Sequence, residues 1–137
     1  MTKIFYRDGY KYQLKQHYTL HVSMKPPIDI DTQFIKFSTS GVLTIKSGYA
    51  WDGASGPTTD TKNFMRGSLV HDALYQLMRE NHLDHLKFRK LADQELKKIC
   101  LEDGMSSFRA NLVYFIVRWF GDYAADPANN HAIIEAP

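Results

Sequence analysis

His71 lies in the segment HDALY, where a residue type common in catalysis occupies a position that a helix would normally give to a packing residue. Its spacing from Phe64 and Met78 follows the helical period, so we expect the imidazole on the inward face of a helix. A buried imidazole needs hydrogen-bond partners for both ring nitrogens. Asp93, in the ADQEL segment of the next predicted helix, is placed to reach it. A carboxylate that fixes the tautomer of His71 would make the histidine a candidate general base.

Asp72 follows His71 directly and therefore points about 100° away around the same helix. We expect its carboxylate to face the glycine-rich segment 48–56. Backbone carbonyls of that segment, including Gly53, and the carboxylates of Asp72 and Asp52 make a set of hard oxygen ligands suited to calcium. The same glycines are also typical of turns, and Asp72 is equally compatible with a plain surface carboxylate.

Trp51 and Arg66 are the candidate substrate contacts. Trp51 lies in the glycine-rich segment, where it is also compatible with a core residue packed beneath the loop. For Arg66, one turn before His71, an ion pair with Asp52 or Asp72 is favoured over binding of a substrate phosphate.

The hydrophobic period changes near residue 62. Short runs of alternating apolar and polar residues in the first 50 positions predict a small antiparallel sheet, and the glycines that follow predict a loop. The predicted fold class is α+β, a small N-terminal antiparallel sheet followed by three packed α-helices. We expect the helices at 62–79, at 86–101, and from the Ser106/Ser107 cap to a stop at Gly121.

The length of 137 residues, with 44% hydrophobic and 23% charged side chains, is typical of one globular domain. We assign residues 1–125 to a single α+β domain and residues 126–137 to a loosely ordered C-terminal tail. Phe115, Trp119 and Phe120 of the last helix are assigned to the core, because that helix is apolar over most of its circumference.

Charge and cysteine content exclude several classes of function. A net charge of +2 without runs of like charge does not favour nucleic acid as a partner. The single cysteine, Cys100, excludes an internal disulfide and lacks the paired spacing of structural zinc sites. The longest apolar run, 112–117, is too short to cross a bilayer, and the N-terminus lacks the apolar core of a secretory signal peptide.

The segments GYAWDGASGP, HDALY, ADQEL and VRWFG together resemble a family of short phage and prophage proteins known mainly as a domain of unknown function. The resemblance covers roughly residues 45–121. It implies a viral protein encoded by a phage or prophage, located in the host cytoplasm or in the phage particle, with other phage proteins as partners. It implies no settled activity.

A glycine-containing loop, a helix with His-Asp-x-x-Tyr and a later helix with an aspartate are similar to the layout of phospholipase A2. The resemblance implies that His71 activates water and that Asp93 orients it. It further implies that Asp72 binds calcium with loop carbonyls, that Tyr75 hydrogen-bonds in the same network, and that the partner is phospholipid or a membrane surface. The chain departs from the layout in having no disulfides around the motif, a loosely matching loop and a preceding sheet.

The sequence therefore predicts a phospholipase A2-like hydrolase that acts on a lipid ester with a His-Asp dyad and calcium. The alternative is a non-enzymatic virion or tail component, or a host-interaction protein, in which the same residues form a structural polar network. A His-Asp metal phosphohydrolase is less favoured, because it needs a histidine on an upstream helix, whereas His17 and His21 lie in strand-like sequence.

Overall fold

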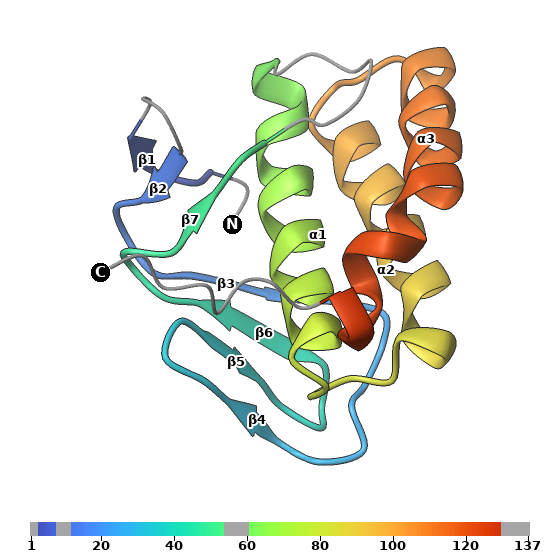
Figure 1. Ribbon diagram of the computed structural model, residues 1–137. Helices are drawn as coiled ribbons and strands as arrows, with labels where there is room; N and C mark the ends of the chain where they lie inside the picture. The colour runs from blue at the N-terminus through green and yellow to red at the C-terminus, as the bar shows by residue number, and fades with distance from the viewer. Residues whose placement is uncertain (1–2, 8–11, 54–60, 130–137) are drawn as a thin grey trace.

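A computed structural model describes residues 3–7, 12–53 and 61–129. The predicted α+β class is confirmed, because strands occupy the N-terminal half and three α-helices follow. Figure 1 shows the longest helices grouped on one side of the molecule and the strands on the other. The strands form two small sheets rather than one.

Both sheets are antiparallel, and along the strands of the four-stranded sheet buried residues alternate with more exposed ones. In the four-stranded sheet, Leu43 and Ile45 of strand β6 (Val42–Ile45) are buried in the core. Leu43 pairs with Phe37 of the neighbouring strand. In the three-stranded sheet Tyr12 pairs with Trp51. The first sheet has the order β1 (Tyr6–Arg7), β2 (Tyr12–Leu14), β7 (Ala50–Trp51), and the second β3 (Tyr18–His21), β6 (Val42–Ile45), β5 (Ile35–Phe37), β4 (Ile30–Asp31).

The three helices are α1 (Lys62–Arg79), α2 (His85–Glu102) and α3 (Ser107–Ala125). Helix α1 lies between the sheets and the other two helices, so it is buried on nearly all sides (Figure 1). Asp84 caps α2 by accepting from the Leu86 amide at 3.0 Å, and Ser106 caps α3 by accepting from the Arg109 amide at 3.2 Å. None of the helices in the described ranges is long and apolar enough to span a membrane.

Gly121 does not end α3, contrary to the prediction, because the helix continues to Ala125. The glycine serves close helix packing instead: a Cβ at this position would lie 2.5 Å from the Tyr75 hydroxyl and 3.1 Å from Arg89 Nη1. Beyond α3, a 3₁₀ helix at Pro127–Asn129 contacts α1 and α3. Residues 130–137 of the predicted tail lie outside the described part of the chain.

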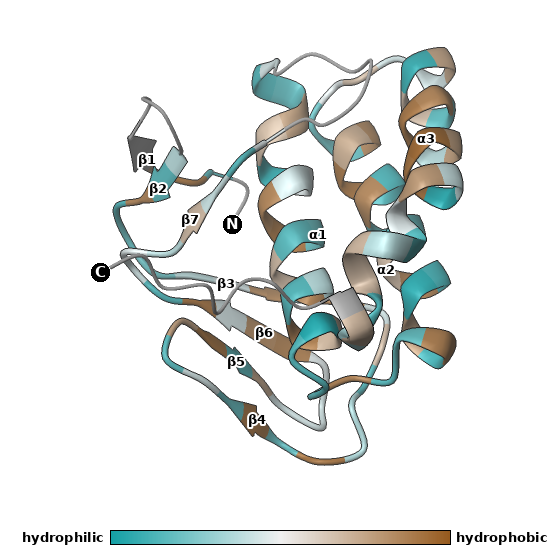
Figure 2. Ribbon diagram, viewed as in Figure 1, coloured by the Kyte–Doolittle hydropathy of each residue, from teal (hydrophilic) through white to brown (hydrophobic). Residues whose placement is uncertain are grey.

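The assignment of Phe115, Trp119 and Phe120 to the core is wrong, because their side chains are 67%, 82% and 65% exposed. Helix α3 is at the edge of the helical layer, where it has one contact face, and small residues such as Ala110 and Gly121 occupy that face. Its bulky residues therefore point outward. Figure 2 shows hydrophobic colour over most of α3, including its outer side.

Candidate active site

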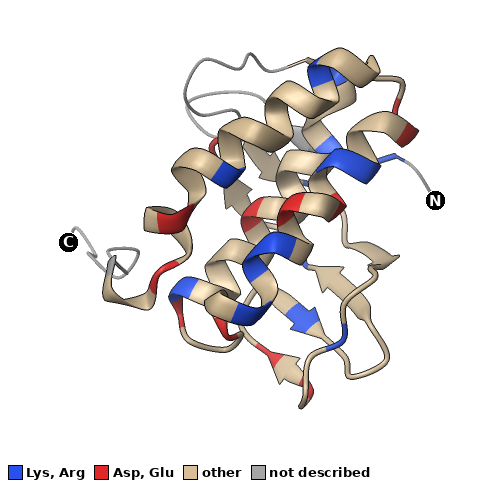
Figure 3. Ribbon diagram, turned by 90° about the vertical axis from the view of Figure 1, so that its right-hand side faces the viewer, with Lys and Arg blue, Asp and Glu red and all other residues tan. Residues whose placement is uncertain are grey.

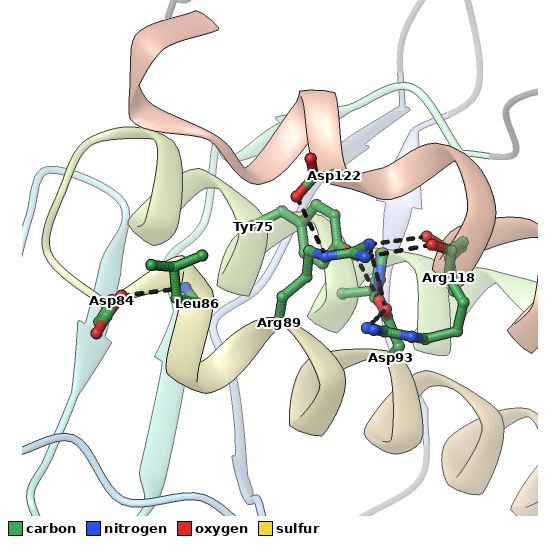
Figure 4. A network of polar contacts seen from close by, with 9 residues as sticks. Tyr75, Asp84, Leu86, Arg89, Asp93, Arg118 and Asp122 are labelled. Carbon is green, nitrogen blue, oxygen red and sulfur yellow. Dashed lines mark hydrogen bonds and ion pairs between the residues drawn. The ribbon is translucent and has the colours of Figure 1, made fainter.

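Asp93 is the centre of a polar network that joins all three helices. Its side chain is completely buried on α2. The Oδ1 atom lies 2.7 Å from His71 Nε2 and accepts a hydrogen bond of 2.5 Å from the Tyr75 hydroxyl, both on α1. The Oδ2 atom accepts from Arg118 Nη1 of α3 at 2.8 Å. The predicted meeting of His71, Tyr75 and Asp93 is therefore present in the structure. Figure 4 shows Asp93 together with Tyr75 and Arg118.

The surroundings of Asp93 keep its carboxyl group ionised. Burial raises the pKa of Asp93, but hydrogen bonds from His71, Tyr75 and Arg118 outweigh burial, so its pKa lies below the ordinary value. An ionised carboxylate accepts hydrogen bonds and cannot donate them, so His71 Nε2 carries the proton that it shares with Asp93. In the neutral imidazole, Nδ1 is then the acceptor nitrogen.

Nδ1 of His71 has no hydrogen-bond partner among the described residues. The side chain is 12% exposed and lines a cavity, so Nδ1 is the imidazole atom available to a small molecule there. The His71 and Tyr75 rings are tilted against each other with centroids 4.1 Å apart, which restricts rotation of the imidazole. The arrangement matches the needs of a general base: one nitrogen held by a carboxylate, the other available to receive a proton.

Arg89 connects this network to the end of α3. Its guanidinium donates to the backbone carbonyls of Val117 and Arg118, each at 3.2 Å. The same group lies 3.7 Å from Asp93 Oδ2 and 3.8 Å from Asp122 Oδ1. Figure 4 shows Arg89 between these two carboxylates. Arg89 therefore fixes the position of the helix that supplies Arg118.

A cavity of about 140 Å³ lies between α1 and α3, beside His71. Its α1 wall is largely polar, whereas its α3 wall is largely apolar. The α1 wall contains Phe64, Ser68, His71, Asp72, Tyr75 and Arg79, and the remaining wall contains Gly53, Leu96, Val113, Ile116, Val117, Phe120, Gly121 and Ala124. Such a two-sided lining suits a molecule with a polar reacting group and an apolar remainder.

The predicted calcium ligands lie next to this cavity. Asp72 accepts a hydrogen bond of 3.2 Å from the Tyr49 hydroxyl, and Asp72 and Gly53 both line the cavity. Burial raises the pKa of Asp72, and the nearby negative charge of Asp52 raises it further, whereas Arg79 opposes the shift. Two carboxylates that repel each other provide the charge that a cation would neutralise.

Within residues 3–7, 12–53 and 61–129 there is no group of three or more His, Cys, Asp or Glu side chains that could hold a metal ion. Residues 54–56 of the predicted calcium loop lie outside these ranges.

Trp51 is a core residue rather than a cavity-lining one, because its side chain is buried and does not contribute to the cavity wall. Its indole Nε1 donates to Ser68 Oγ at 3.0 Å, and that hydroxyl donates to the Met65 carbonyl at 3.0 Å. Trp51 therefore holds strand β7 against α1, next to the cavity. The expected direct contact with substrate does not follow from this position.

Arg66 lies away from the cavity and does not pair with Asp52 or Asp72, so the expected ion pair is wrong. Its guanidinium bonds Asp103, with the shortest contact at 2.9 Å, Glu102 at 2.9 Å and the Tyr18 hydroxyl at 2.8 Å. With every donor nitrogen engaged by protein groups in a buried position, Arg66 is unsuited to anchoring a substrate phosphate.

The sequence did not reveal Arg89 and Arg118 as members of the network. For Arg89 a signal existed, because Arg89 and Asp93 are spaced i, i+4 on one predicted helix, where opposite charges meet. For Arg118 no local signal existed, since its contact with Asp93 depends on how α3 packs on α2.

Comparison with protein-family models, curated proteins and solved structures finds no match to this chain. The resemblance of residues 45–121 to the phage family, and of the His-Asp-x-x-Tyr segment to phospholipase A2, therefore stays a prediction from the residues themselves.

Proposed function

We propose that the protein is a hydrolase in which His71 activates a water molecule for attack on a lipid ester. The observation that carries the proposal is the position of His71 between a buried carboxylate and a cavity. Its Nε2 lies 2.7 Å from Asp93, and its Nδ1 has no hydrogen-bond partner in the described part of the chain. A core histidine with a purely structural role would be expected to have both nitrogens satisfied.

In the proposed reaction, Nδ1 of His71 takes a proton from water as the water oxygen bonds to the ester carbonyl carbon. Asp93 stabilises the imidazolium that forms, because its carboxylate stays ionised. When the tetrahedral intermediate collapses, the ester C–O bond breaks and the imidazolium returns its proton to the leaving alkoxide. The products are a fatty acid and an alcohol, and His71 is neutral again.

Water is a better candidate nucleophile than the hydroxyl of Ser68, which lies on the α1 wall of the cavity. Ser68 Oγ accepts from Trp51 and donates to the Met65 carbonyl within its own helix, so its proton is already engaged. Tyr75 is a positioning residue: burial, with the charge of Asp93, raises the pKa of its phenol, so the hydroxyl remains a donor to Asp93.

Calcium is part of the proposal, because Asp72 and the backbone of Gly53 offer hard oxygen ligands at the cavity, and the negative charge of Asp52 acts on Asp72. A calcium ion bound there would supply positive charge for the oxygen that becomes negative in the reaction. The Tyr49 hydroxyl donates a hydrogen bond to Asp72 Oδ2 and so orients this carboxylate.

The lipid-ester substrate follows from the shape and lining of the cavity. A dry cavity of about 150 Å³ holds a molecule of benzene size, so the cavity of about 140 Å³ holds the ester and the first few methylene groups. Apolar side chains such as Val113, Ile116 and Val117 face that space. The remainder of an acyl chain would extend along the outside of α3.

The test is product analysis by mass spectrometry of mixed phospholipid vesicles incubated with the protein, with calcium or with a chelator. We expect fatty-acid release that needs calcium and that falls by about 10²- to 10⁴-fold in His71→Gln, the usual range for loss of a general base. His82→Gln, which changes an exposed histidine outside the cavity, is the matched control and should be as active as the wild type.

Two outcomes would contradict the proposal. One is hydrolysis by folded His71→Gln at the wild-type rate. The other is absence of fatty-acid release under every condition from wild-type protein whose circular dichroism shows it to be folded. Release that a chelator leaves unchanged would remove calcium from the proposal and leave the role of His71 intact.

A further inference from the structure

Helix α3 carries a row of large apolar side chains on its outer face, which we call the α3 stripe. Trp119 and Phe108 are 82% and 81% exposed, which is unusual for side chains of this size. The stripe consists of Phe108, Leu112, Phe115, Trp119 and Phe120.

Helical geometry places the α3 stripe opposite the packed face of the same helix. Residues three, four and seven apart share a side of a helix, so Phe108, Leu112, Phe115 and Trp119 form one continuous row. The packed face uses small residues instead, among them Ala110. Helix α3 is therefore apolar on two sides, and the described part of the chain covers one of them. A contiguous exposed apolar row of this kind marks an interaction surface.

The α3 stripe leads directly to the cavity beside His71. Phe120 belongs to both, because it is exposed at the surface and also lines the cavity. Ile116, partly buried one turn earlier, lines the cavity as well. Whatever binds the stripe is thus adjacent to the place where the proposed reaction occurs.

Helix α2 presents positive charge beside the stripe. Its four lysines, Lys87, Lys90, Lys97 and Lys98, are exposed or half-buried. Of its three acidic side chains, Asp93 and Glu95 are buried and Glu102 is exposed at the end of the helix. Lys97 Nζ lies 5.7 Å from the ring centroid of Tyr114, so at Lys97 the positive charge of α2 borders α3. In Figure 3, α2 carries blue segments at both ends and red segments as well, next to a mostly tan α3.

We propose that the α3 stripe docks on an anionic phospholipid surface, with the α2 lysines contacting the headgroups. The apolar side chains would enter the boundary between headgroups and acyl chains, as the apolar face of an interfacial helix does. Each lysine near an anionic surface contributes attraction that salt weakens. The inference rests on the proposed function for its claim that docking delivers the substrate, but the docking itself is separately measurable.

A second copy of the chain fits the stripe less well than a lipid surface does. A symmetric pair joined through α3 would bring two lysine-bearing α2 helices toward each other, and like charges across an interface are unfavourable. The pair would also cover Phe120 at the edge of the cavity.

The experiment uses the two tryptophans of the full chain as an internal comparison. Trp51 is buried in the core, whereas Trp119 is exposed, so transfer into lipid changes the emission of Trp119. We expect a blue shift with vesicles containing phosphatidylglycerol, little shift with phosphatidylcholine alone, and weaker binding at higher salt. Trp119→Ala should bind such vesicles about tenfold more weakly or worse, because burial of one large apolar side chain contributes about that much.

Three variants separate docking from chemistry. Ile28→Ala removes another exposed apolar side chain, 67% exposed and far from α3 in sequence, in the segment before β4, and should bind vesicles like the wild type. His71→Gln should bind vesicles normally without hydrolysing them. Trp119→Ala, which does not line the cavity, should hydrolyse a soluble short-chain ester at the wild-type rate.

The docking proposal is overturned if folded wild-type protein does not bind phosphatidylglycerol vesicles by sedimentation. It is equally overturned if the protein is a dimer without lipid and Trp119→Ala makes it monomeric, because the stripe would then be a contact between copies. If vesicles bind while no ester is hydrolysed, the proposed function fails and the docking surface stands.

Discussion

Helix α1 carries two buried charged networks that differ in one respect. Arg66 bonds Asp103, Glu102 and Tyr18, and all three guanidinium nitrogens are engaged. One and a half turns later, His71 bonds Asp93 through a single nitrogen and turns the other side of its ring toward a cavity. Burial and hydrogen bonding are therefore common to both networks, and an available nitrogen at a cavity is what separates a candidate site from an internal brace.

The strongest way to test this contrast is to remove Arg66, the centre of the saturated network. We expect Arg66→Ala to lower the free energy of unfolding by about 3 kcal/mol, because the partly buried Asp103 would lose its partner, the buried Arg66. The estimate is at the low end for such pairs because Glu102 is half exposed and shielded by water. Urea unfolding measures the loss.

The same variant should keep its activity, in contrast to His71→Gln. Turnover per folded molecule of Arg66→Ala should equal that of the wild type, measured well below the unfolding midpoint. A large loss of turnover in folded Arg66→Ala would show that the two networks are not functionally distinct, and the comparison would fail.

Two glycines in helices allow a matched test of packing near each network. A methyl group at Gly121 would meet the Tyr75 hydroxyl at 2.5 Å, so Tyr75 would have to move away from Asp93. We expect Gly121→Ala to cost about 2 kcal/mol in unfolding free energy, as overpacking usually does, and to lower turnover. Differential scanning calorimetry and vesicle hydrolysis measure the two effects.

Gly67→Ala is the control for that substitution. Its added methyl would lie 3.0 Å from Cys100 Sγ and from a terminal methyl of Leu96, which are flexible ends of side chains. We expect a smaller cost in stability and wild-type turnover. Equal losses of activity in both variants would contradict the assignment of Tyr75 as a positioning residue.

Asp72→Asn should have the smallest effect on the free energy of unfolding, and it should raise stability where the other substitutions lower it. Burial raises its pKa in the folded protein above the unfolded value. The folded state then binds more protons between the two pKa values, so stability falls as pH rises through that window. Above the window the full penalty of the buried charge remains. Asp72→Asn removes the penalty, so we expect about 1 kcal/mol more stability at neutral pH together with lower turnover.

Urea unfolding of Asp72→Asn and of the wild type at several pH values measures this gain in stability. The gain should shrink as pH falls through the folded pKa of Asp72, because protonation relieves the wild type of the same charge. Asp52→Asn, at an exposed carboxylate, should leave stability within about 0.5 kcal/mol of the wild type. A loss of stability in Asp72→Asn at neutral pH would mean that the carboxylate is a structural bond to Tyr49 and no more.

The sequence predicted those parts of the structure that depend on local period. Helix α1 matches the predicted bounds 62–79, and the inward position of His71 follows from its spacing. The meeting of His71 with Asp93 was also predictable, since both lie beside apolar stripes that must pack together. Arg118 was not, because its reach to Asp93 depends on the packing of α3.

The two errors on α3 have one physical origin. The prediction that apolar residues of α3 lie in the core assumes that other elements pack around the whole helix. Helix α3 is packed on one side, so its large apolar residues on the other side are exposed. Glycine often ends a helix, which predicts a stop at Gly121, whereas here Gly121 allows the close approach of Tyr75. The hydrophobic period of a helix alone does not predict whether that helix lies in the centre or at the edge of the helical layer.

Asp93 depends on α3 for Arg118, and α3 follows α1 and α2 along the chain. During synthesis, α1 and α2 leave the ribosome before Arg118 and the apolar wall of the cavity have been made. A nascent or C-terminally truncated chain therefore has His71 without a complete pocket. If the protein acts on lipid esters, the order of translation delays that activity until the whole helical layer has folded, which protects the membranes of the cell that makes it.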